Sequence, residues 1–150
     1  MNLLSLFLKR KVELGFTFGY LLLLILFHWQ LNFDWSILFF LGGGILGVYF
    51  LDLADLVFKI EPKPYRNVFF QTAFILMTLF IITSSGSLMG AGLVLSIYLN
   101  MILSQFKEIQ EKGNLDEWFK LIKREVDIKT QKIYLGVISG AFLLLNLLFL

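Results

Sequence analysis

The sequence of 150 residues contains no cysteine, two prolines and one histidine. Without cysteine the chain cannot form a disulfide scaffold or a thiolate metal site. The scarcity of proline is typical of long helices and not of a loop-rich secreted module. Charged residues make up only 16% of the chain, whereas soluble domains carry about 25%. The formal net charge of +2 is too small to indicate a polyanionic partner such as nucleic acid.

Apolar residues, by contrast, are abundant, at 58% of the chain with 17 phenylalanines. The mean hydropathy is +0.80. Soluble domains contain about 45–50% apolar residues, and a water-soluble core of this chain length cannot bury such an excess. The composition therefore predicts an integral membrane protein. It argues against a cytosolic enzyme, a disordered chain and a nucleic-acid-binding protein.

Five apolar stretches are long enough to cross a membrane as helices, which takes about 17–25 residues. These stretches are apolar on every side, unlike the alternating strands of a membrane β-barrel. We therefore predict an all-α fold, a polytopic membrane helix bundle that forms a single domain over residues 1–150. The expected spans are 14–31, 36–58, 67–84, 88–106 and 133–150.

All 13 lysines and arginines lie on one side of these spans. The opposite loops, 32–35 and 85–87, carry none. Because basic residues are retained on the cytoplasmic side, we predict a cytoplasmic N-terminus and a C-terminus on the opposite side of an inner or plasma membrane. This orientation fits a bacterial protein. The single histidine, His28, then lies at the far edge, where we expect an interfacial residue and not a catalytic one.

The long loop before the last span contains a pattern typical of a second kind of helix. Apolar residues recur there at helical spacing, and charged residues occupy the opposite face. Such amphipathic helices lie in the membrane surface, so we predict an interfacial helix over residues 115–127 that anchors the chain. A docking site for a soluble partner is the alternative. The apolar face consists of Leu115, Trp118, Phe119, Ile122 and Val126.

Small residues at four-residue spacing recur in three of the spans and allow helix backbones to approach closely in lipid. We expect these faces to pack helices together inside the bundle. Association of two copies of the chain, or of the chain with another membrane protein, is the alternative. The pairs are Gly43 and Gly47, Gly86 and Gly90, Gly92 and Ser96, and Gly136 and Gly140.

Ionisable residues at membrane depth are candidates for function, because their burial is costly. Asp52 and Asp55 lie near the end of the second span, three residues apart on roughly one helix face. They could ligate Mg²⁺ or Mn²⁺. Alternatively they lie at the headgroup boundary, with Asp55 paired to Lys59, and the spacing alone favours this interpretation. We expect further polar side chains to converge with them near the cytoplasmic helix ends, namely Asn67, Gln71, Thr72, Asn100, Ser104 and Gln105.

The run from Gly47 to Leu56, which contains both aspartates, resembles the motif of small inner-membrane metal-dependent hydrolases of the YdjM type. In that family a glycine precedes an Asp-x-Asp-His stretch that closes a membrane helix, and histidine and aspartate positions follow in later helices. Segments 67–73, 83–88 and 100–105 fall in the corresponding order, so the resemblance covers residues 42–119. It implies a helical membrane fold with a divalent metal site.

This chain departs from the family pattern at nearly every ligand position. Asp52 matches the first aspartate, and Asp55 stands where the family has a histidine. Amides and hydroxyls cannot supply the anionic or imidazole donors that a catalytic divalent ion needs. The remaining expected ligands are replaced by Ala54, Asn67, Gln71, Asn100 and Ser104, with Thr72 in place of a serine.

The resemblance therefore implies a degenerate relative that is not an enzyme, keeps the helical scaffold, binds no cofactor and has a structural or interaction role in the lipid bilayer. One alternative is an active membrane hydrolase of a lipid or phosphate-type substrate. In that case Asp52 and Asp55 would ligate a divalent metal ion or act as acid and base. Another is a small transporter or transporter subunit, but the spans lack the paired broken helices and mid-membrane charges typical of transporter sites.

Overall fold

The computed structural model describes residues 11–30, 32, 34–58, 67–115, 118–119 and 126–149, with the backbone alone at 51–52, 54–58 and 85. These residues contain no strand, so the predicted all-helical fold is confirmed for this part of the chain. The helices are α2 (Lys11–Trp29), α3 (Ser36–Phe58), α4 (Val68–Phe80), the π-helical turn η1 (Ile81–Ser85), α5 (Leu88–Lys112) and α6 (Ile128–Phe149).

Side chains and glycines in the local sequence determine several helix ends. Asn67 caps α4 by accepting a hydrogen bond from the Phe70 N–H at 2.8 Å. Ser87 caps α5 in the same way, accepting from the Gly90 N–H at 3.0 Å. At the other end of α5, Gly113 has a φ of 77°, a left-handed conformation that glycine adopts without steric cost. Helices α4 and α5 therefore begin after residues that favour a helix start, and α5 ends at a residue that favours a helix end.

Three of the helices, α2, α5 and α6, are long and apolar enough to cross a membrane. Shorter apolar helical stretches occupy Ser36–Phe50 within α3 and Val68–Ser84 within α4 and η1. Helical structure thus occurs in every predicted span, although only three helices meet the criterion of length and composition. The largest differences from the predicted bounds are in α5, which continues past residue 106 to Lys112, and in α6, which begins before residue 133 at Ile128.

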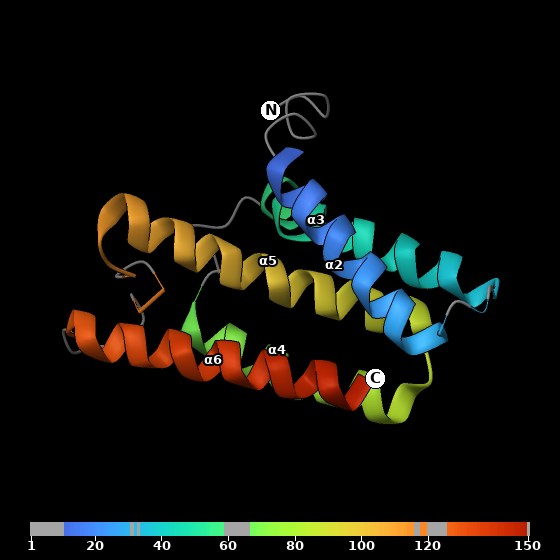
Figure 1. Ribbon diagram of the computed structural model, residues 1–150. Helices are drawn as coiled ribbons and strands as arrows, with labels where there is room; N and C mark the ends of the chain where they lie inside the picture. Colours follow the sequence, from blue (N-terminus) through green and yellow to red (C-terminus); the bar gives the residue numbers. More distant parts are fainter. Residues whose placement is uncertain are drawn as a thin grey trace.

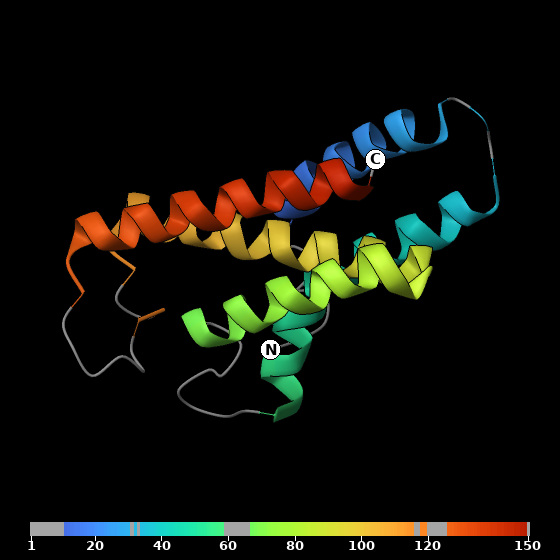
Figure 2. The same ribbon diagram turned by 90° about the horizontal axis from the view of Figure 1, so that it is seen from below.

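Helix α5 lies in the middle of the bundle and contacts each of the other four α-helices. Figure 1 shows α2 and α3 on one side of α5, and α4 and α6 on the other. The end of α3 turns away from α5, since its last turns are seen end-on in Figure 1 and from the side in Figure 2. The last turns of α3 therefore leave the line of the other helices.

The close packing of α3 on α5 depends on glycine. A Cβ atom on Gly43 would lie 2.1 Å from the Met89 carbonyl oxygen, and one on Gly92 would lie 2.2 Å from the Phe40 carbonyl oxygen. These glycines pack helices within the chain, as expected for small residues in a membrane bundle. On α6, by contrast, a Cβ atom on Gly140 would meet nothing within 4 Å. The expected role in internal packing therefore applies to some of the glycines only.

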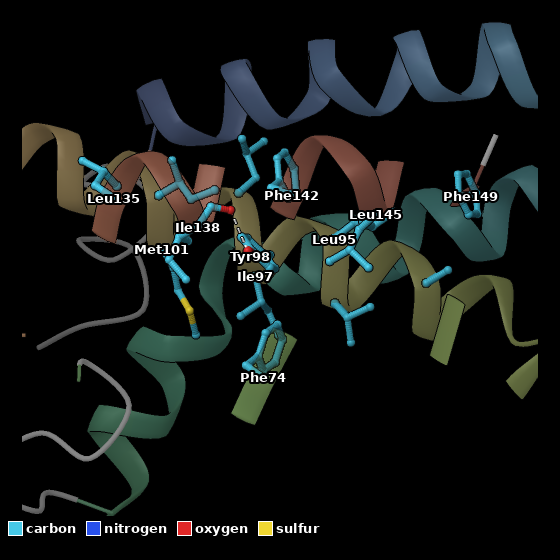
Figure 3. Packing of buried hydrophobic residues seen from close by; sticks show 14 of the residues in the cluster. Phe74, Leu95, Ile97, Tyr98, Met101, Leu135, Ile138, Phe142, Leu145 and Phe149 are labelled. Carbon is cyan, nitrogen blue, oxygen red and sulfur yellow. Dashed lines mark hydrogen bonds between the residues drawn. The ribbon is translucent and has the colours of Figure 1, made fainter. Parts of the chain in front are cut away.

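Aromatic and aliphatic side chains from α5 and α6 form much of the core, as Figure 3 shows. The Tyr98 and Phe142 rings lie with their centroids 5.0 Å apart. The Tyr98 hydroxyl donates a hydrogen bond of 2.7 Å to the carbonyl oxygen of Ile138. Tyr98 thus combines apolar packing with a hydrogen bond to a neighbouring helix, which a buried phenol needs.

The distribution of polarity is the reverse of that in a water-soluble bundle. Many large apolar side chains on the outer faces are exposed, for example Phe16 on α2 and Leu147 on α6, at 58% and 68%. Polar groups that lie in lipid must find their partners inside the protein. The structure therefore agrees with an integral membrane protein. Among the described residues, the buried polar ones are Thr17, Asn67, Gln71, Thr78, Ser96, Asn100, Gln105, Gln131 and Asn146.

Candidate functional site

Two glutamines form a reciprocal pair between α4 and α5. Gln71 Nε2 donates to Gln105 Oε1 at 3.1 Å, and Gln105 Nε2 donates to Gln71 Oε1 at 2.8 Å. Tyr134 of α6 donates its hydroxyl to Gln71 Oε1 at 3.0 Å. We call these three residues the glutamine–tyrosine cluster. It joins three helices at the end of the bundle where α4 and α6 begin.

A second polar group lies at the middle of α5 and faces α2. Asn100 Nδ2 donates to Thr17 Oγ1 at 3.2 Å and to the carbonyl oxygen of Ser96 at 2.8 Å. All three residues are buried. Asparagine is unfavourable in the interior of a helix. The hydrogen bond from Asn100 to Thr17 compensates for this by joining α5 to α2.

Further along α2, a third set of polar contacts reaches α6. Tyr20 donates its hydroxyl to Asn146 Oδ1, and Asn146 Nδ2 donates to the Phe142 carbonyl oxygen at 2.7 Å. His28 Nδ1 lies 3.1 Å from the carbonyl oxygen of Phe149, and the two rings stack with centroids 4.6 Å apart. His28 therefore contacts the last turn of α6 through packing and a hydrogen bond.

Two aromatic residues that follow α5, Trp118 and Phe119, pack against the bundle. Trp118 is 2% exposed, and its Nε1 donates to Glu108 Oε2 at 2.8 Å. The Trp118 carbonyl oxygen accepts a 3.0 Å hydrogen bond from the Val68 N–H at the start of α4. The Phe119 ring meets the Tyr134 ring edge to face, with centroids 5.3 Å apart. The protein itself therefore covers these two aromatic side chains, and their place at the membrane surface stays a prediction.

Gln131 of α6 makes hydrogen bonds to two residues of the connection between α5 and α6, Leu115 and Val126. Its Oε1 accepts from the Leu115 N–H at 2.8 Å, and its Nε2 donates to the Val126 carbonyl oxygen at 3.1 Å. Leu115 is fully buried and Val126 is half-buried. Residues 116–117 and 120–125, among them Ile122, lie outside the described residues, so the predicted helix over 115–127 stays a prediction.

The structure brings together only part of the polar cluster predicted from the sequence, because Gln71 meets Gln105 but Asn100 does not join them. Gln71 bonds with Gln105 and Tyr134, whereas Asn100 bonds with Thr17 on the other side of α5. Asn100 also lies at the midpoint of the 25-residue α5 and not toward its end. The predicted polar residues therefore belong to separate contacts between different pairs of helices.

The other predicted site residues have local roles or lie outside the described side chains. Asn67 is the N-cap of α4, and Thr72 Oγ1 donates to the Val68 carbonyl oxygen at 2.8 Å within the same helix. Ser104 is half-buried on α5. The side chains of Ala54, Asp52 and Asp55 lie outside those that the structure describes.

Several polar residues that the structure brings together were not predicted as site residues. Thr17, Tyr20, Gln131, Tyr134 and Asn146 all make hydrogen bonds between helices or to the segment after α5. The sequence could have indicated these residues only as polar side chains at positions that share a helix face with the buried apolar residues. Those positions can be identified only when the buried face of each helix is known from the structure.

The described polar groups are mostly neutral, which limits their chemistry to hydrogen bonding. Among the described residues, no three histidine, aspartate or glutamate side chains lie close enough to hold a metal ion. Of the charged groups, Glu108 is engaged by Trp118 and lies 3.6 Å from the Lys112 ammonium. Asp127, just before α6, has its pKa lowered by hydrogen bonds from the Thr130 side chain and backbone. The contacts among the described polar side chains are thus mainly hydrogen bonds between helices.

Comparison of the chain with protein-family models, with curated proteins and with solved structures found no match. The resemblance to the YdjM-type hydrolases therefore stays a prediction from the sequence motif. The structure itself shows a helical fold, three helices long and apolar enough to cross a membrane, and polar contacts between helices.

Proposed function

We propose that this chain is a non-catalytic integral membrane protein, built on a hydrolase-like helical scaffold, with a structural or interaction role. The observation that carries the proposal is that polar side chains at the family's ligand positions are bonded to the chain itself. Gln71 pairs with Gln105, Asn100 bonds to Thr17, and Asn67 caps α4. At positions where the resemblance would put metal ligands, these residues instead make hydrogen bonds within the chain.

The energetics also favour adhesion over metal binding at these positions. Gln71 Oε1 accepts hydrogen bonds from both Gln105 and Tyr134, so a metal ion at this oxygen would have to displace two donors. Neutral amide oxygens offer little compensation, since catalytic divalent ions need anionic or imidazole ligands. An interhelical hydrogen bond in a membrane contributes on average about 0.6 kcal/mol, and several of them together help to hold the bundle.

The proposal includes five membrane spans, a cytoplasmic N-terminus and a C-terminus on the opposite side of an inner or plasma membrane. Charge supports this orientation, because every basic residue of the sequence falls at one side of the spans. The glutamine–tyrosine cluster and the segment around Trp118 then lie at the cytoplasmic end of the bundle.

Metal analysis of the purified protein tests the proposal. Protein extracted and purified without chelators should contain far less than one divalent ion per chain by elemental mass spectrometry. One tightly held divalent ion per chain would favour the hydrolase alternative. If such an ion were present, its loss in the Asp52→Asn variant would identify the second span as its site.

Function in cells gives a second test. Asp52→Asn should unfold at the same temperature as the wild-type chain and should rescue a deletion strain equally well, because an amide keeps hydrogen bonding and removes the desolvation cost of a charge at membrane depth. The control is Asp34→Asn, in the exposed connection between α2 and α3, which both hypotheses predict to be neutral. An Asp52→Asn protein that folds but fails to rescue, beside a functional control, would overturn the proposal.

A further inference from the structure

The outward face of α6 carries a continuous stripe of exposed apolar side chains. The buried residues of this helix, such as Leu135 and Phe142, recur at helical spacing and face the bundle. Figure 1 shows that α6 runs along one edge of the bundle, so that its other face points away from the protein. The side chains of the stripe are between 58% and 68% exposed and belong to Ile133, Val137, Leu143, Leu144, Leu147 and Leu148.

Two lysines lie at the beginning of the same stripe. Lys129 and Lys132 are both exposed, and their spacing of three residues places them next to each other on one helix face. Among the described residues, neither lysine forms an ion pair. The described acid closest to them in the sequence, Asp127, accepts a hydrogen bond from the Thr130 N–H at 3.1 Å. The described part of the chain therefore leaves both positive charges without a counter-charge.

The length of α6 places these lysines at the level of lipid headgroups. Its 22 residues, Ile128–Phe149, extend over about 33 Å at a rise of about 1.5 Å per residue. This is slightly more than the hydrocarbon thickness of a bilayer, about 30 Å, so the first turn of α6 lies at the membrane boundary when the rest of the helix crosses the core. From Ile133 to Leu143 the helix rises by about 15 Å, which matches the hydrocarbon depth of one leaflet.

We propose that Lys129 and Lys132, together with the apolar stripe, bind an anionic phospholipid on the outward face of α6. The two ammonium groups attract the negative headgroup, and the acyl chains lie along the side chains from Ile133 to Leu143. A lysine near a membrane surface favours anionic lipid by about fivefold. The inference rests on the proposed function, because the proposed membrane orientation assigns both lysines to the cytoplasmic leaflet.

The two lysine charges argue against a second copy of the chain on this face. In a dimer whose two-fold axis runs along the membrane normal, the same face of α6 meets itself. Lys129 and Lys132 of one copy would then approach the same lysines of the other, and like charges repel each other. A zwitterionic lipid can cover the stripe but carries no net charge for the lysines to attract. A lipid of net negative charge therefore fits this face best.

Quenching of a fluorescent label by brominated lipid tests the proposal. Since the chain has no cysteine, Ile133→Cys accepts a single label beside the lysines, in the full chain reconstituted into phosphatidylcholine vesicles. Brominated phosphatidylglycerol should quench this label several times more effectively than the same mole fraction of brominated phosphatidylcholine. A label at Leu147→Cys, at the far end of the same stripe, should show no such preference. Equal quenching by the two lipids at Ile133→Cys would overturn the proposal.

Charge variants on two helices distinguish a lipid site on α6 from a general attraction to basic residues. Lys129→Gln combined with Lys132→Gln should abolish the preference for phosphatidylglycerol at the label. Lys107→Gln combined with Lys112→Gln removes the same charge from exposed positions of α5 and should leave the preference nearly unchanged. An equal fall in both double variants would overturn the proposal. A label that neither lipid quenches would also overturn it, because another protein chain would then cover the face. The metal content and the rescue by Asp52→Asn do not depend on these results, so failure of the lipid site and failure of the proposed function are distinguishable.

Discussion

Replacing Gly92 by alanine should destabilise the bundle by forcing α3 and α5 apart. The new Cβ atom would lie 2.2 Å from the Phe40 carbonyl oxygen and 3.1 Å from the Gly44 nitrogen. Both are backbone atoms of α3, so no side-chain rotation relieves the clash. Helix α3 must shift by roughly 1 Å before this becomes an ordinary van der Waals contact. Overpacking of this kind costs about 1–3 kcal/mol or more.

Gly140 on α6 is the matched control, because it is also a helical glycine in an apolar segment. A Cβ atom there would meet nothing within 4 Å. Alanine is favoured over glycine in a helix interior by about 0.5–1 kcal/mol, so Gly140→Ala should stabilise the protein. The same substitution is thus expected to have opposite signs at the two positions.

Both variants can be compared by thermal unfolding in lipid nanodiscs, followed by tryptophan fluorescence. For a chain of this size, 1 kcal/mol corresponds to a shift of about 2–4 °C. Wild-type stability of Gly92→Ala would refute the argument that α3 and α5 require glycine for their close approach. Destabilisation by Gly140→Ala would instead mean that the outer face of α6 is covered, for example by a second copy of the chain.

The remaining predictions concern the segment after α5, the start of α6 and the orientation in the membrane. Trp118→Phe keeps the aromatic packing but removes the donor to Glu108, so it should accelerate proteolysis of this segment in membranes, and unchanged cleavage would show that the hydrogen bond is unimportant. The lowered pKa of Asp127 comes mainly from the Thr130 side chain; its stabilising effect should be complete above the unfolded pKa of about 3.9 and should disappear as the pH falls through the folded pKa. The unfolding temperatures of the wild-type chain and Asp127→Asn should therefore converge in acid, and a constant difference would contradict this. Finally, a reporter active only in the cytoplasm should give no signal when fused to the C-terminus, and a strong signal there would reverse the orientation.

The helical fold was predictable because lipid allows few alternatives. Long apolar stretches in a bilayer must satisfy their own backbone, and a helix does this without partners. The bounds of α3 follow the predicted span closely, whereas α5 extends to Lys112. Its extra turns carry charged residues that hydropathy excludes from a span but that a helix accommodates outside the membrane. The end of α5 is therefore determined by where the helical backbone hydrogen bonds stop, and not by where the apolar stretch stops.

The candidate site was predicted less well, because polar residues were grouped by depth and not by helix face. Asn100 and Gln71 were expected to meet, yet they bond across different sides of α5. Trp118 was expected in the membrane surface, since an amphipathic pattern shows which residues share a face but not what covers that face. In the structure the protein covers it, through Glu108 and the start of α4.

The amide contacts determine the pairing of helices more than they determine total stability. An interhelical hydrogen bond in a membrane is worth only about 0.6 kcal/mol on average. A shift of α4 by one turn, about 5.4 Å, would break both bonds between Gln71 and Gln105 and leave buried amide groups in an apolar environment. Each unpaired buried group costs about 1–3 kcal/mol, so the penalty for the wrong register is several times the gain from the right one. Apolar packing alone gives no comparable distinction, because leucine and phenylalanine side chains meet lipid and protein almost equally well. A membrane bundle with so few charges therefore uses neutral amides to specify which helices meet and at what height.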